Sequence, residues 1–232
     1  ISTFESNIRG TWGILEASRR SPGVQQVVVA SSDKAYGTQP ELPYTEEMPL
    51  LAHHPYDVSK ACADMLATSY HMTFGVPVCV TRCGNFFGPG DTNWNRLVPG
   101  TIRSLLRGIR PLIRSDGTPI RDYLYVVDGA LAYLQLAQAM SQDPSLVGQT
   151  FNFSTESEVA AIDFARLIAE VVGRPDLEPD VRAVANNEIP HQYLSAKKAR
   201  ELLNWAPHYT IQHAMETTVS WYRDYLVEDR SH

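Results

Sequence analysis

The sequence contains little cysteine and no long apolar run. Its three cysteines, Cys62, Cys79 and Cys83, are an odd number, which argues against a disulfide framework. Cys79 and Cys83 stand four residues apart in an expected strand, about 13 Å at ~3.3 Å per residue, whereas a disulfide requires Cα atoms within about 7 Å. We therefore expect buried free thiols in a reducing cytoplasm. No stretch approaches the roughly 18–20 apolar residues of a membrane-spanning helix, so we expect no membrane partner.

Lysine and positive charge are also scarce. Only four of the 20 cationic residues are lysines, and the net charge is -6 with an isoelectric point of about 5.6. A protein that coats nucleic acid is normally basic, so we expect no nucleic-acid partner. The 7 histidines form no H-E-x-x-H or similar pattern, so we expect no metal. With 44% hydrophobic and 20% charged residues, the composition is that of a globular protein with a sizeable core.

Helices alternate with short apolar strands in the first part of the chain. Residues 2–20 carry apolar side chains at helical spacing, and residues 2–5 have the form of a capping box. The β-branched run 27–30 is typical of a strand buried on both faces. A second helix is expected over 57–74 and a second strand over 76–82. This alternation indicates an α/β domain with a parallel sheet.

The pattern loosens in the second half of the chain. The expected elements are a loop over 86–95, helices over 97–107, 131–140, 162–172, 196–203 and 211–227, and strands over 112–113, 123–126 and 151–153. Gly75 and Gly173 are expected to end the helices before them. We interpret the second half as a lobe that accompanies the first.

The central chemical motif is Tyr56-x-x-x-Lys60. Positions i and i+4 of a helix share a face, about 6 Å apart, and a nearby ammonium lowers the pKa of a phenol because it favours the phenolate. Tyr56 can then exchange a proton with a substrate hydroxyl. The alternative is an ordinary exposed pair on a helix, because the motif alone is weak.

Polar residues also follow the first expected strand, in the run Ser31-Ser32-Asp33-Lys34. The carboxyl ends of parallel strands are where open α/β sheets bind ligands. A hydroxyl, a carboxylate and an ammonium at this edge indicate proton-transfer chemistry. The alternative is a polar cap in which Ser31 or Asp33 bonds the backbone.

Two further segments carry candidate ligand contacts. The run 82–91 follows the second strand and contains Asn85 and several glycines, which permit close approach of a ligand to the backbone. The run 116–123 contains Arg121, which can bind a diphosphate through paired hydrogen bonds. The alternative for the run 82–91 is a simple turn, and the alternative for the run 116–123 is a patch of surface charge.

These four elements, in this order and spacing, resemble the extended short-chain dehydrogenase/reductase family that acts on nucleotide sugars. The resemblance extends from Ile1 to about Leu226. Within the family, Ser32-Asp33-Lys34 and the run 85–99 are similar to the corresponding segments of the 4,6-dehydratases of CDP-glucose. The dTDP-glucose enzymes carry Thr-Asp-Glu where this chain has Ser32-Asp33-Lys34. Pro89 departs from the usual run of glycines.

The resemblance implies a Rossmann-type parallel sheet in residues 1–90 and a smaller mixed α/β substrate lobe, with segments that return to the sheet, in residues 91–232. It implies NAD as cofactor, a nucleotide-diphosphate sugar as substrate, a cytoplasmic enzyme, and a homodimer built on the first helix and the helix 57–74. The family's glycine-rich dinucleotide fingerprint has no counterpart in these residues. We expect that the N-terminal dinucleotide-binding strands are missing, and that the chain as printed does not hold NAD tightly.

The resemblance also implies roles for single residues. Tyr56 takes the proton of the sugar 4-hydroxyl, and Lys60 holds the nicotinamide ribose. Asp33 is the acid that protonates the departing 6-hydroxyl, Lys34 occupies the position of the base that removes the C5 proton, and Ser32 bonds the 4-oxygen. A lysine serves as that base only if burial or a nearby cation lowers its pKa.

The remaining expected site residues fall into two sets. Those that contact the cofactor are Ser31, Tyr56, Lys60, Cys83 and Asn85. Those that contact the substrate are Asn85, Arg96, Leu97, Arg121, Asn152 and the segment Glu188–Gln192, including Glu188 and His191. Asn7 matches an asparagine on the helix that leads to the active site; the alternative places it on the helix's wet side.

Other functions remain open on the sequence alone. A nucleotide-sugar 4-epimerase or a UDP-glucuronate decarboxylase uses the same Tyr56 and Lys60, and only Asp33 and Lys34 favour dehydration. A non-catalytic nucleotide-sugar-binding protein is an alternative of another class, favoured by the missing fingerprint and opposed by the intact Tyr56 and Lys60.

Overall fold

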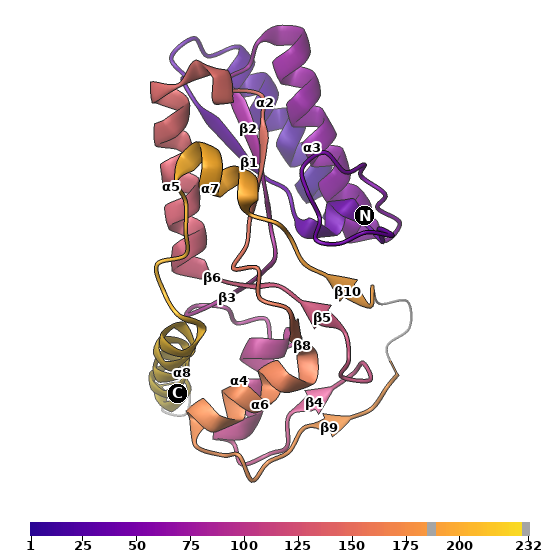
Figure 1. Ribbon diagram of the computed structural model, residues 1–232, viewed down its shortest axis with the longest axis vertical. Helices are drawn as coiled ribbons and strands as arrows, with labels where there is room; N and C mark the ends of the chain where they lie inside the picture. Colours follow the sequence, from indigo (N-terminus) through magenta and orange to yellow (C-terminus); the bar gives the residue numbers. More distant parts are fainter. Residues whose placement is uncertain (185–188, 229–232) are drawn as a thin grey trace. The chain divides into compact units, whose positions relative to one another are not determined.

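The computed structural model describes residues 1–184 and 189–228. The chain divides into two compact units, each assembled from three segments (Figure 1). The first unit comprises Ile1–Gly84, Gly129–Glu156 and Gln192–Ala206, and the second comprises Asn85–Asp128, Ser157–His191 and Pro207–His232. Neither unit is therefore continuous in sequence.

A parallel sheet organises the first unit. Its strands are β1 (Val27–Ala30), β2 (Val78–Cys83) and β7 (Thr150–Phe153), in the spatial order β1-β2-β7. Every residue of β2 is buried, as expected of a central strand covered on both faces. The β-branched run 27–30 forms the strand that the sequence predicts, but its predicted burial on both faces is wrong. β1 is the first strand in the order β1-β2-β7, and Val29 is its one buried residue.

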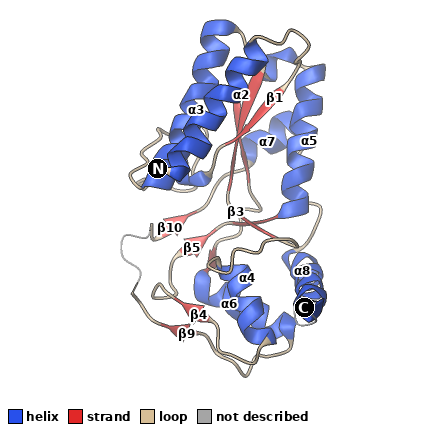
Figure 2. Ribbon diagram, turned by 180° about the vertical axis from the view of Figure 1, so that it is seen from behind, coloured by secondary structure: helices blue, strands red, loops and turns tan. Residues whose placement is uncertain are grey.

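Helices cover both faces of this sheet, with α2 and α3 on one side and α5 and α7 on the other (Figure 2). The helical elements of the first unit are α1 (Ser2–Phe4), the π-helical turn η1 (Glu5–Arg9), α2 (Gly10–Arg19), η2 (Asp33–Tyr36), α3 (Pro55–Phe74), η3 (Pro144–Leu146), α7 (Lys197–Leu203) and most of α5 (Val126–Gln142). This arrangement confirms the Rossmann-type architecture.

The ends of two helices show which local signals hold. Gly75 adopts φ 68° and ends α3, and Gly173 adopts φ 82° and ends the helix before it, as the sequence predicts. The predicted capping box at residues 2–5 is wrong. Ser2 makes no capping bond, and the Glu5 carboxylate accepts a hydrogen bond from Arg9 at 3.0 Å. The Glu5 carboxylate, which a capping box requires, therefore forms an i, i+4 ion pair with Arg9 instead.

The second unit pairs short strands around three helices. β3 (Asn85–Phe87) lies parallel to β6 (Tyr123–Tyr125), β4 (Leu112–Ile113) lies parallel to β9 (Asp180–Val181), and β5 (Ile120–Arg121) lies antiparallel to β8 (Val159–Ala160). The helices are α4 (Leu97–Leu106), α6 (Ala161–Val172) and α8 (Ile211–Glu228), and the chain returns to the first unit within β10 (His191–Gln192). The predicted loop over 86–95 therefore begins with strand residues, because a distant partner, β6, supplies their hydrogen bonds.

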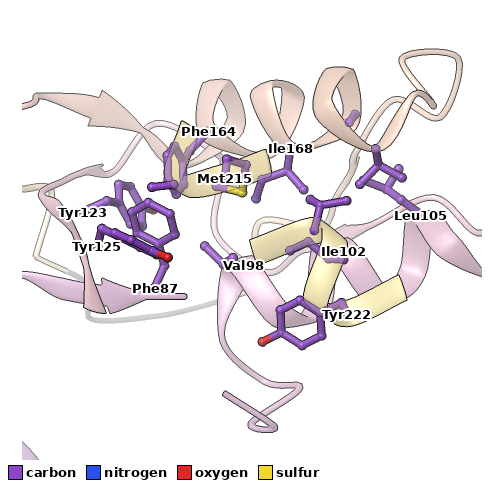
Figure 3. Packing of buried hydrophobic residues seen from close by; sticks show 14 residues of the cluster. Phe87, Val98, Ile102, Leu105, Tyr123, Tyr125, Phe164, Ile168, Met215 and Tyr222 are labelled. Carbon is purple, nitrogen blue, oxygen red and sulfur yellow. The ribbon is translucent and has the colours of Figure 1, made fainter. Parts of the chain in front are cut away.

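An aromatic and aliphatic core holds this second unit together (Figure 3). The ring of Phe164 stacks on Tyr123 at 3.8 Å between centroids and meets the Phe87 ring edge-on at 5.7 Å. Val98 and Ile102 of α4 continue the core beside Ile168 of α6. Burying one such side chain contributes about 1.5–3 kcal/mol, so the unit has its own source of stability.

Within the described residues, no helix is both long and apolar enough to cross a membrane.

Candidate active site

The first turns of α3 present Tyr56 and Lys60 on one face of the helix. The Lys60 ammonium lies 6.0 Å from the centre of the Tyr56 ring, and it donates a hydrogen bond to the Ala30 carbonyl at 2.9 Å. Burial lowers the pKa of Lys60 below its ordinary value. The Tyr56 side chain is accessible, since the residue is 47% exposed. A phenol open to a ligand therefore stands beside a cation fixed at the carboxyl end of β1.

Ser31 and Asn7 fix this face of α3 from two directions. The Ser31 hydroxyl donates to the Lys60 carbonyl at 3.2 Å, and its backbone amide donates to the Thr81 carbonyl at 2.9 Å. Asn7, in the π-helical turn η1, donates to the Ser59 hydroxyl at 2.9 Å, and that hydroxyl donates to the Tyr56 carbonyl at 2.6 Å. Both residues thus act on the backbone that carries Tyr56 and Lys60. Their contacts to a cofactor stay predictions.

Ser32 begins the short helical turn η2, which carries Asp33 and Lys34. The Ser32 hydroxyl accepts from the Lys34 amide at 3.2 Å, which is an N-cap bond, and donates to Asp33 Oδ1 at 2.8 Å. Asp33 is 1% exposed, and its second oxygen, Oδ2, has no hydrogen-bond partner in the part of the chain that the structure describes. A buried polar atom without a partner costs about 1–3 kcal/mol. Such an atom requires an explanation, and a ligand that supplies the missing partner is one.

Gln192 holds the Lys34 side chain. The Lys34 ammonium donates to Gln192 Oε1, and Gln192 Nε2 donates to the Asp33 carbonyl at 3.2 Å. Gln192 itself is fully buried. The family resemblance implies that the segment containing Gln192 contacts the nucleotide, whereas in the structure the Gln192 side chain bonds the Lys34 ammonium and the Asp33 carbonyl.

Asp57 is a buried acid that sequence analysis missed. It follows Tyr56 directly in the first turn of α3. Burial raises the pKa of its carboxyl above the ordinary value, Lys34 and His54 oppose this rise, and Asp33 adds to it. The available signal was its position, since acidic residues favour the first turn of a helix, but nothing local indicates that the side chain is buried.

The predicted site residues at the ends of β2 and β3 belong to different units. Cys83 is the last residue of β2 and is buried in the first unit. Asn85 is half-buried and opens β3 in the second unit, where its amide donates to the Asp122 carbonyl at 2.8 Å. The structure describes each within its own unit, and their contact with a cofactor stays a prediction.

Most predicted substrate contacts lie in the second unit. The Arg121 guanidinium donates to the Ile189 carbonyl at 2.7 Å and to the Ile120 carbonyl at 2.9 Å. Arg96 pairs with Asp91 at 3.1 Å, and its side chain is largely exposed. Leu97 begins α4 and His191 is exposed at the start of β10, whereas Glu188 falls outside the described residues. Guanidinium groups such as those of Arg96 and Arg121 are suited to an anionic ligand.

Asn152 differs from the other predicted substrate contacts. It is fully buried on β7 in the first unit, where its Oδ1 accepts from the Tyr36 hydroxyl at 2.8 Å and its Nδ2 donates to the Tyr44 carbonyl at 3.0 Å. Protein groups already occupy both ends of its amide. Contact with a nucleotide stays a prediction.

The thiols and acids of the chain give no sign of metal binding in the described ranges. No group of three or more His, Cys, Asp or Glu side chains there is arranged to hold a metal ion. Cys62, Cys79 and Cys83 form no disulfide in the described part of the chain, and Cys79 donates to the Leu146 carbonyl at 3.0 Å.

The first unit therefore combines a parallel sheet, covered on both faces, with a phenol, two ammonium groups and a buried carboxyl near the carboxyl end of β1. This combination defines a Rossmann-type domain equipped for proton transfer. Residues 1–153, more than half of the chain, match the model of the NAD dependent epimerase/dehydratase family, and the chain belongs to that family. The family and the fold that the sequence predicts are both confirmed.

Curated and solved relatives agree with this assignment. The chain is 31% identical over 219 residues to the dTDP-glucose 4,6-dehydratase of Streptomyces antibioticus, an alignment that covers 94% of this chain and 63% of that protein. A crystal structure of dTDP-Glucose 4,6-dehydratase from Bacillus anthracis in complex with NAD has a TM-score of 0.85 at 29% identity and covers 95% of this chain and 68% of that one. The UDP-Glucose 4-Epimerase of Thermotoga maritima, solved with UDP-glucose, has a TM-score of 0.87 at 27% identity, over 96% of this chain and 71% of that one. The chain thus spans a little under two thirds of the length of the Streptomyces antibioticus relative.

Proposed function

We propose that this protein is an NAD-dependent nucleotide-sugar 4,6-dehydratase, which converts a nucleotide-diphosphate glucose to the 4-keto-6-deoxy sugar with loss of water. The observation that carries the proposal is the buried Asp33 carboxyl, whose Oδ2 lacks a partner among the described residues, in the same unit as Tyr56 and Lys60. Oxidation at C4, with NAD as the hydride acceptor, needs only a phenol and its cation from the protein. Elimination of a hydroxyl needs an additional acid, and Asp33 is suited to that role.

The donors of this site fit NAD. When bound, NAD would supply the acceptor for the C4 hydride and, after elimination, the hydride donor to C6, while C5 regains a proton. The Lys60 ammonium has three donors, one of which the Ala30 carbonyl accepts, so the others are available to the ribose hydroxyls. Cys83 and Ser31 stand at the carboxyl ends of β2 and β1, where dinucleotides bind in this class of sheet.

Tyr56 and Lys60 act first, at the sugar 4-hydroxyl. The Tyr56 phenolate takes the hydroxyl proton as the C4–H bond breaks, and the Lys60 ammonium stabilises the phenolate before this transfer. Ser59 and Asn7 hold the backbone of Tyr56 in place during the step. The 4-ketone that results acidifies the C5 proton.

Asp33 and Lys34 act second, at C5 and C6. A base removes the C5 proton, the electron pair forms the C5=C6 bond, and the C6–O bond breaks as Asp33 delivers a proton from Oδ2 to the leaving hydroxyl. Lys34 stands where the resemblance places the base, and it acts as one only in its neutral form. In the free site its ammonium donates to Gln192, which keeps the nitrogen beside Asp33.

We infer CDP-glucose as the preferred substrate. The inference rests on the resemblance of Ser32-Asp33-Lys34 to the CDP-sugar dehydratases, whereas the curated relative named above is by name a dTDP-glucose 4,6-dehydratase. Arg121, Arg96 and His191 of the second unit would bind the diphosphate. The nucleotide base is therefore the part of the proposal that a direct assay decides.

We further infer that the protein forms a homodimer through α2 and α3. These two helices lie against each other in the first unit, and they expose large apolar side chains, among them Trp12, Ile14, Met65 and Met72. Large exposed apolar side chains can favour association with another apolar surface when they adjoin one another. A second copy supplies such a surface, as the family resemblance implies.

A nucleotide-sugar 4-epimerase is the second candidate. It needs the same Tyr56 and Lys60 and no acid at C6, and the Thermotoga maritima relative carries that name. The buried Asp33 and its neighbour Lys34 favour the dehydratase, because an epimerase gives them no proton to move.

Mass spectrometry of the products tests the proposal. The protein expressed from its complete gene is incubated with NAD and, separately, with CDP-, UDP- and dTDP-glucose. Loss of one water with CDP-glucose alone supports both parts of the proposal. Loss of water only with another nucleotide supports the dehydratase and overturns the preference for CDP. An unchanged mass with all three sugars, in a protein shown to bind NAD, overturns the dehydratase.

A further inference from the structure

A buried ion pair joins strand β2 to α3, the helix that carries Tyr56 and Lys60. Arg82 of β2 and Asp64 of α3 face each other with side chains 6% and 3% exposed. The guanidinium donates to both carboxylate oxygens, from Nε at 2.7 Å and from Nη2 at 3.0 Å. This two-point contact fixes the orientation of both groups as well as their separation.

The third nitrogen of Arg82 reaches the turn that carries Asp33. Arg82 Nη1 donates to the Tyr36 hydroxyl at 2.8 Å, and the guanidinium carbon lies 4.7 Å from the centre of the Tyr36 ring. Tyr36 is the last residue of η2, which begins at Asp33, and it is fully buried. The position of the Tyr36 hydroxyl therefore constrains the short turn in which Asp33 and Lys34 lie.

Asn152 completes the contact from the neighbouring strand. It stands opposite Arg82 in the register of β2 and β7, and its Oδ1 accepts from the Tyr36 hydroxyl at 2.8 Å. The Asn152 backbone amide donates to the Glu46 carboxylate at 2.7 Å, and its side-chain Nδ2 donates to the Tyr44 carbonyl at 3.0 Å. The Tyr36 hydroxyl is thus held between two strands, as acceptor from one and donor to the other.

Sequence spacing connects this cluster to both halves of the proposed chemistry. Asp64 follows Lys60 by four residues on α3, so the two share a face of the helix. Tyr36 follows Asp33 by three residues within a single turn. Arg82 therefore links the helix of Tyr56 and Lys60 to the turn of Asp33 and Lys34 through side chains alone.

Stability is a poor explanation for this cluster. Desolvating two opposite charges costs about as much as their attraction returns, and apolar replacements of such pairs are often neutral or stabilising. What a bidentate, fully bonded pair supplies is a fixed geometry. Catalytic groups lose activity steeply when displaced, and a shift of about 1 Å can cost about a hundredfold in rate.

We propose that Arg82 is a positioning residue. Together with Asp64, Tyr36 and Asn152, it holds Asp33 in a fixed position relative to Tyr56. We name these four residues the Arg82 brace. The proposal rests on the proposed dehydratase function, since it assigns the brace to the elimination step. It also gives Asn152 a role inside the protein in place of the nucleotide contact that sequence analysis predicts.

Tyr36→Phe is the sharpest test. It removes one hydroxyl with little change in volume and leaves Arg82 Nη1 and Asn152 Oδ1 without that partner. In single-turnover experiments we expect the loss of water, followed by mass, to slow roughly ten- to a hundredfold. We expect the reduction of the nicotinamide, followed by its absorbance, to stay within about twofold of the wild-type rate, because Tyr56 and Lys60 keep their own supports.

Hydrogen exchange provides a readout that does not depend on substrate. The amides of Lys34, Ala35 and Gly37 donate within or beside η2, and we expect them to exchange faster in Tyr36→Phe. Tyr222→Phe is the matched control, because it removes another buried hydroxyl, one that donates to the Asp91 carbonyl in the second unit. It should lower thermal stability without changing exchange at these three amides.

The outcomes separate the brace from the proposed function. Equal slowing of both partial reactions, or unchanged exchange at the three amides, overturns the brace. If the wild-type protein dehydrates no nucleotide-glucose, the proposed function fails, and the exchange measurement alone decides whether the brace holds η2. If Tyr36→Phe does not fold by circular dichroism, Asp64→Asn takes its place, with the same expected and contradicting results.

Discussion

One ion pair in each unit of the molecule illustrates two different placements of charge. In the first, Arg82 and Asp64 form an ion pair whose side chains are 6% and 3% exposed. In the second, the pair between Arg96 and Asp91 leaves the guanidinium 60% exposed, and the core beside it is built from aromatic and aliphatic side chains. Buried charges keep their positions, whereas exposed ones remain available to a ligand. Under the proposed function, the buried pair belongs to the unit with the proposed chemistry, and the exposed guanidinium belongs to the unit proposed to bind the substrate's anionic part.

Tyr56→Phe should break the chemistry of the first unit most completely. It removes the proton acceptor for the 4-hydroxyl, so we expect kcat to fall about a hundred- to ten-thousandfold. Steady-state kinetics with the nucleotide sugar measures this, with Tyr70→Phe as control. Tyr70 lies on the same helix, and its hydroxyl makes a long bond of 3.5 Å to Glu16. A Tyr56→Phe enzyme with nearly full activity would contradict the assignment.

Asp33→Asn should divide the first unit's chemistry into its two steps. The amide offers no acidic proton at the position of Oδ2, so we expect loss of water to slow about a hundred- to ten-thousandfold. Oxidation at C4 should continue, since Tyr56 and Lys60 are intact. The two steps are followed separately by product mass and by the absorbance of the reduced nicotinamide. Full retention of turnover would favour the 4-epimerase.

Arg121→Ala should act on binding and leave the chemistry intact. Losing a charge-assisted contact worth about 1.5–3 kcal/mol raises KM by roughly ten- to a hundredfold with little change in kcat. Arg110→Ala is the matched control, because Arg110 also donates to backbone carbonyls, those of Glu178 and Pro179. If both variants behave alike, or if kcat falls and KM does not, the division of labour between the units is wrong.

Asp57→Asn should have the smallest effect, and its sign is informative. Burial raises the folded pKa of Asp57 above its ordinary value of 3.8, so the folded state holds a proton that the unfolded state has released in the window just above pH 3.8. Stability therefore falls as pH rises through that window. We expect Asn at this position to raise the melting temperature at neutral pH, with the difference vanishing below about pH 3.8.

Thermal unfolding across this pH range measures the effect of Asp57→Asn. Asp163→Asn is the control, since Asp163 is an exposed acid in the first turn of α6, and such substitutions usually change stability by less than about 0.5 kcal/mol. A lower melting temperature for Asp57→Asn at neutral pH would show that the attraction of Lys34 and His54 outweighs burial.

Local signals predicted the parts of the fold that local forces determine. The apolar run 27–30 gave β1 with its observed ends, and Gly75 ended α3 where the left-handed conformation favours glycine. Parts that depend on distant partners were missed. β3 forms because β6, almost forty residues later, supplies its hydrogen bonds, and no local pattern at 85–87 announces that pairing.

The proposed site shows the same limit. Tyr56, Lys60 and Asp33 were found because a motif and a strand end mark them in sequence. Gln192 bonds Lys34 across 158 positions of sequence, and Asn152 bonds Tyr36 across 116. Spacing carries no information about such contacts. The family resemblance implies a nucleotide contact for both residues, and that contact stays a prediction. Asp57 was missed because the packing around the start of α3 determines its burial. The residues next to it in sequence do not indicate that burial.

An isotope experiment tests the central claim most directly. The protein from its complete gene is incubated with NAD and a nucleotide-glucose that carries deuterium at C4, and the product is analysed by mass spectrometry and NMR. The proposed dehydratase gives a product that has lost one water and carries the deuterium at C6. A product of unchanged mass, or a dehydrated product without deuterium at C6, would contradict it.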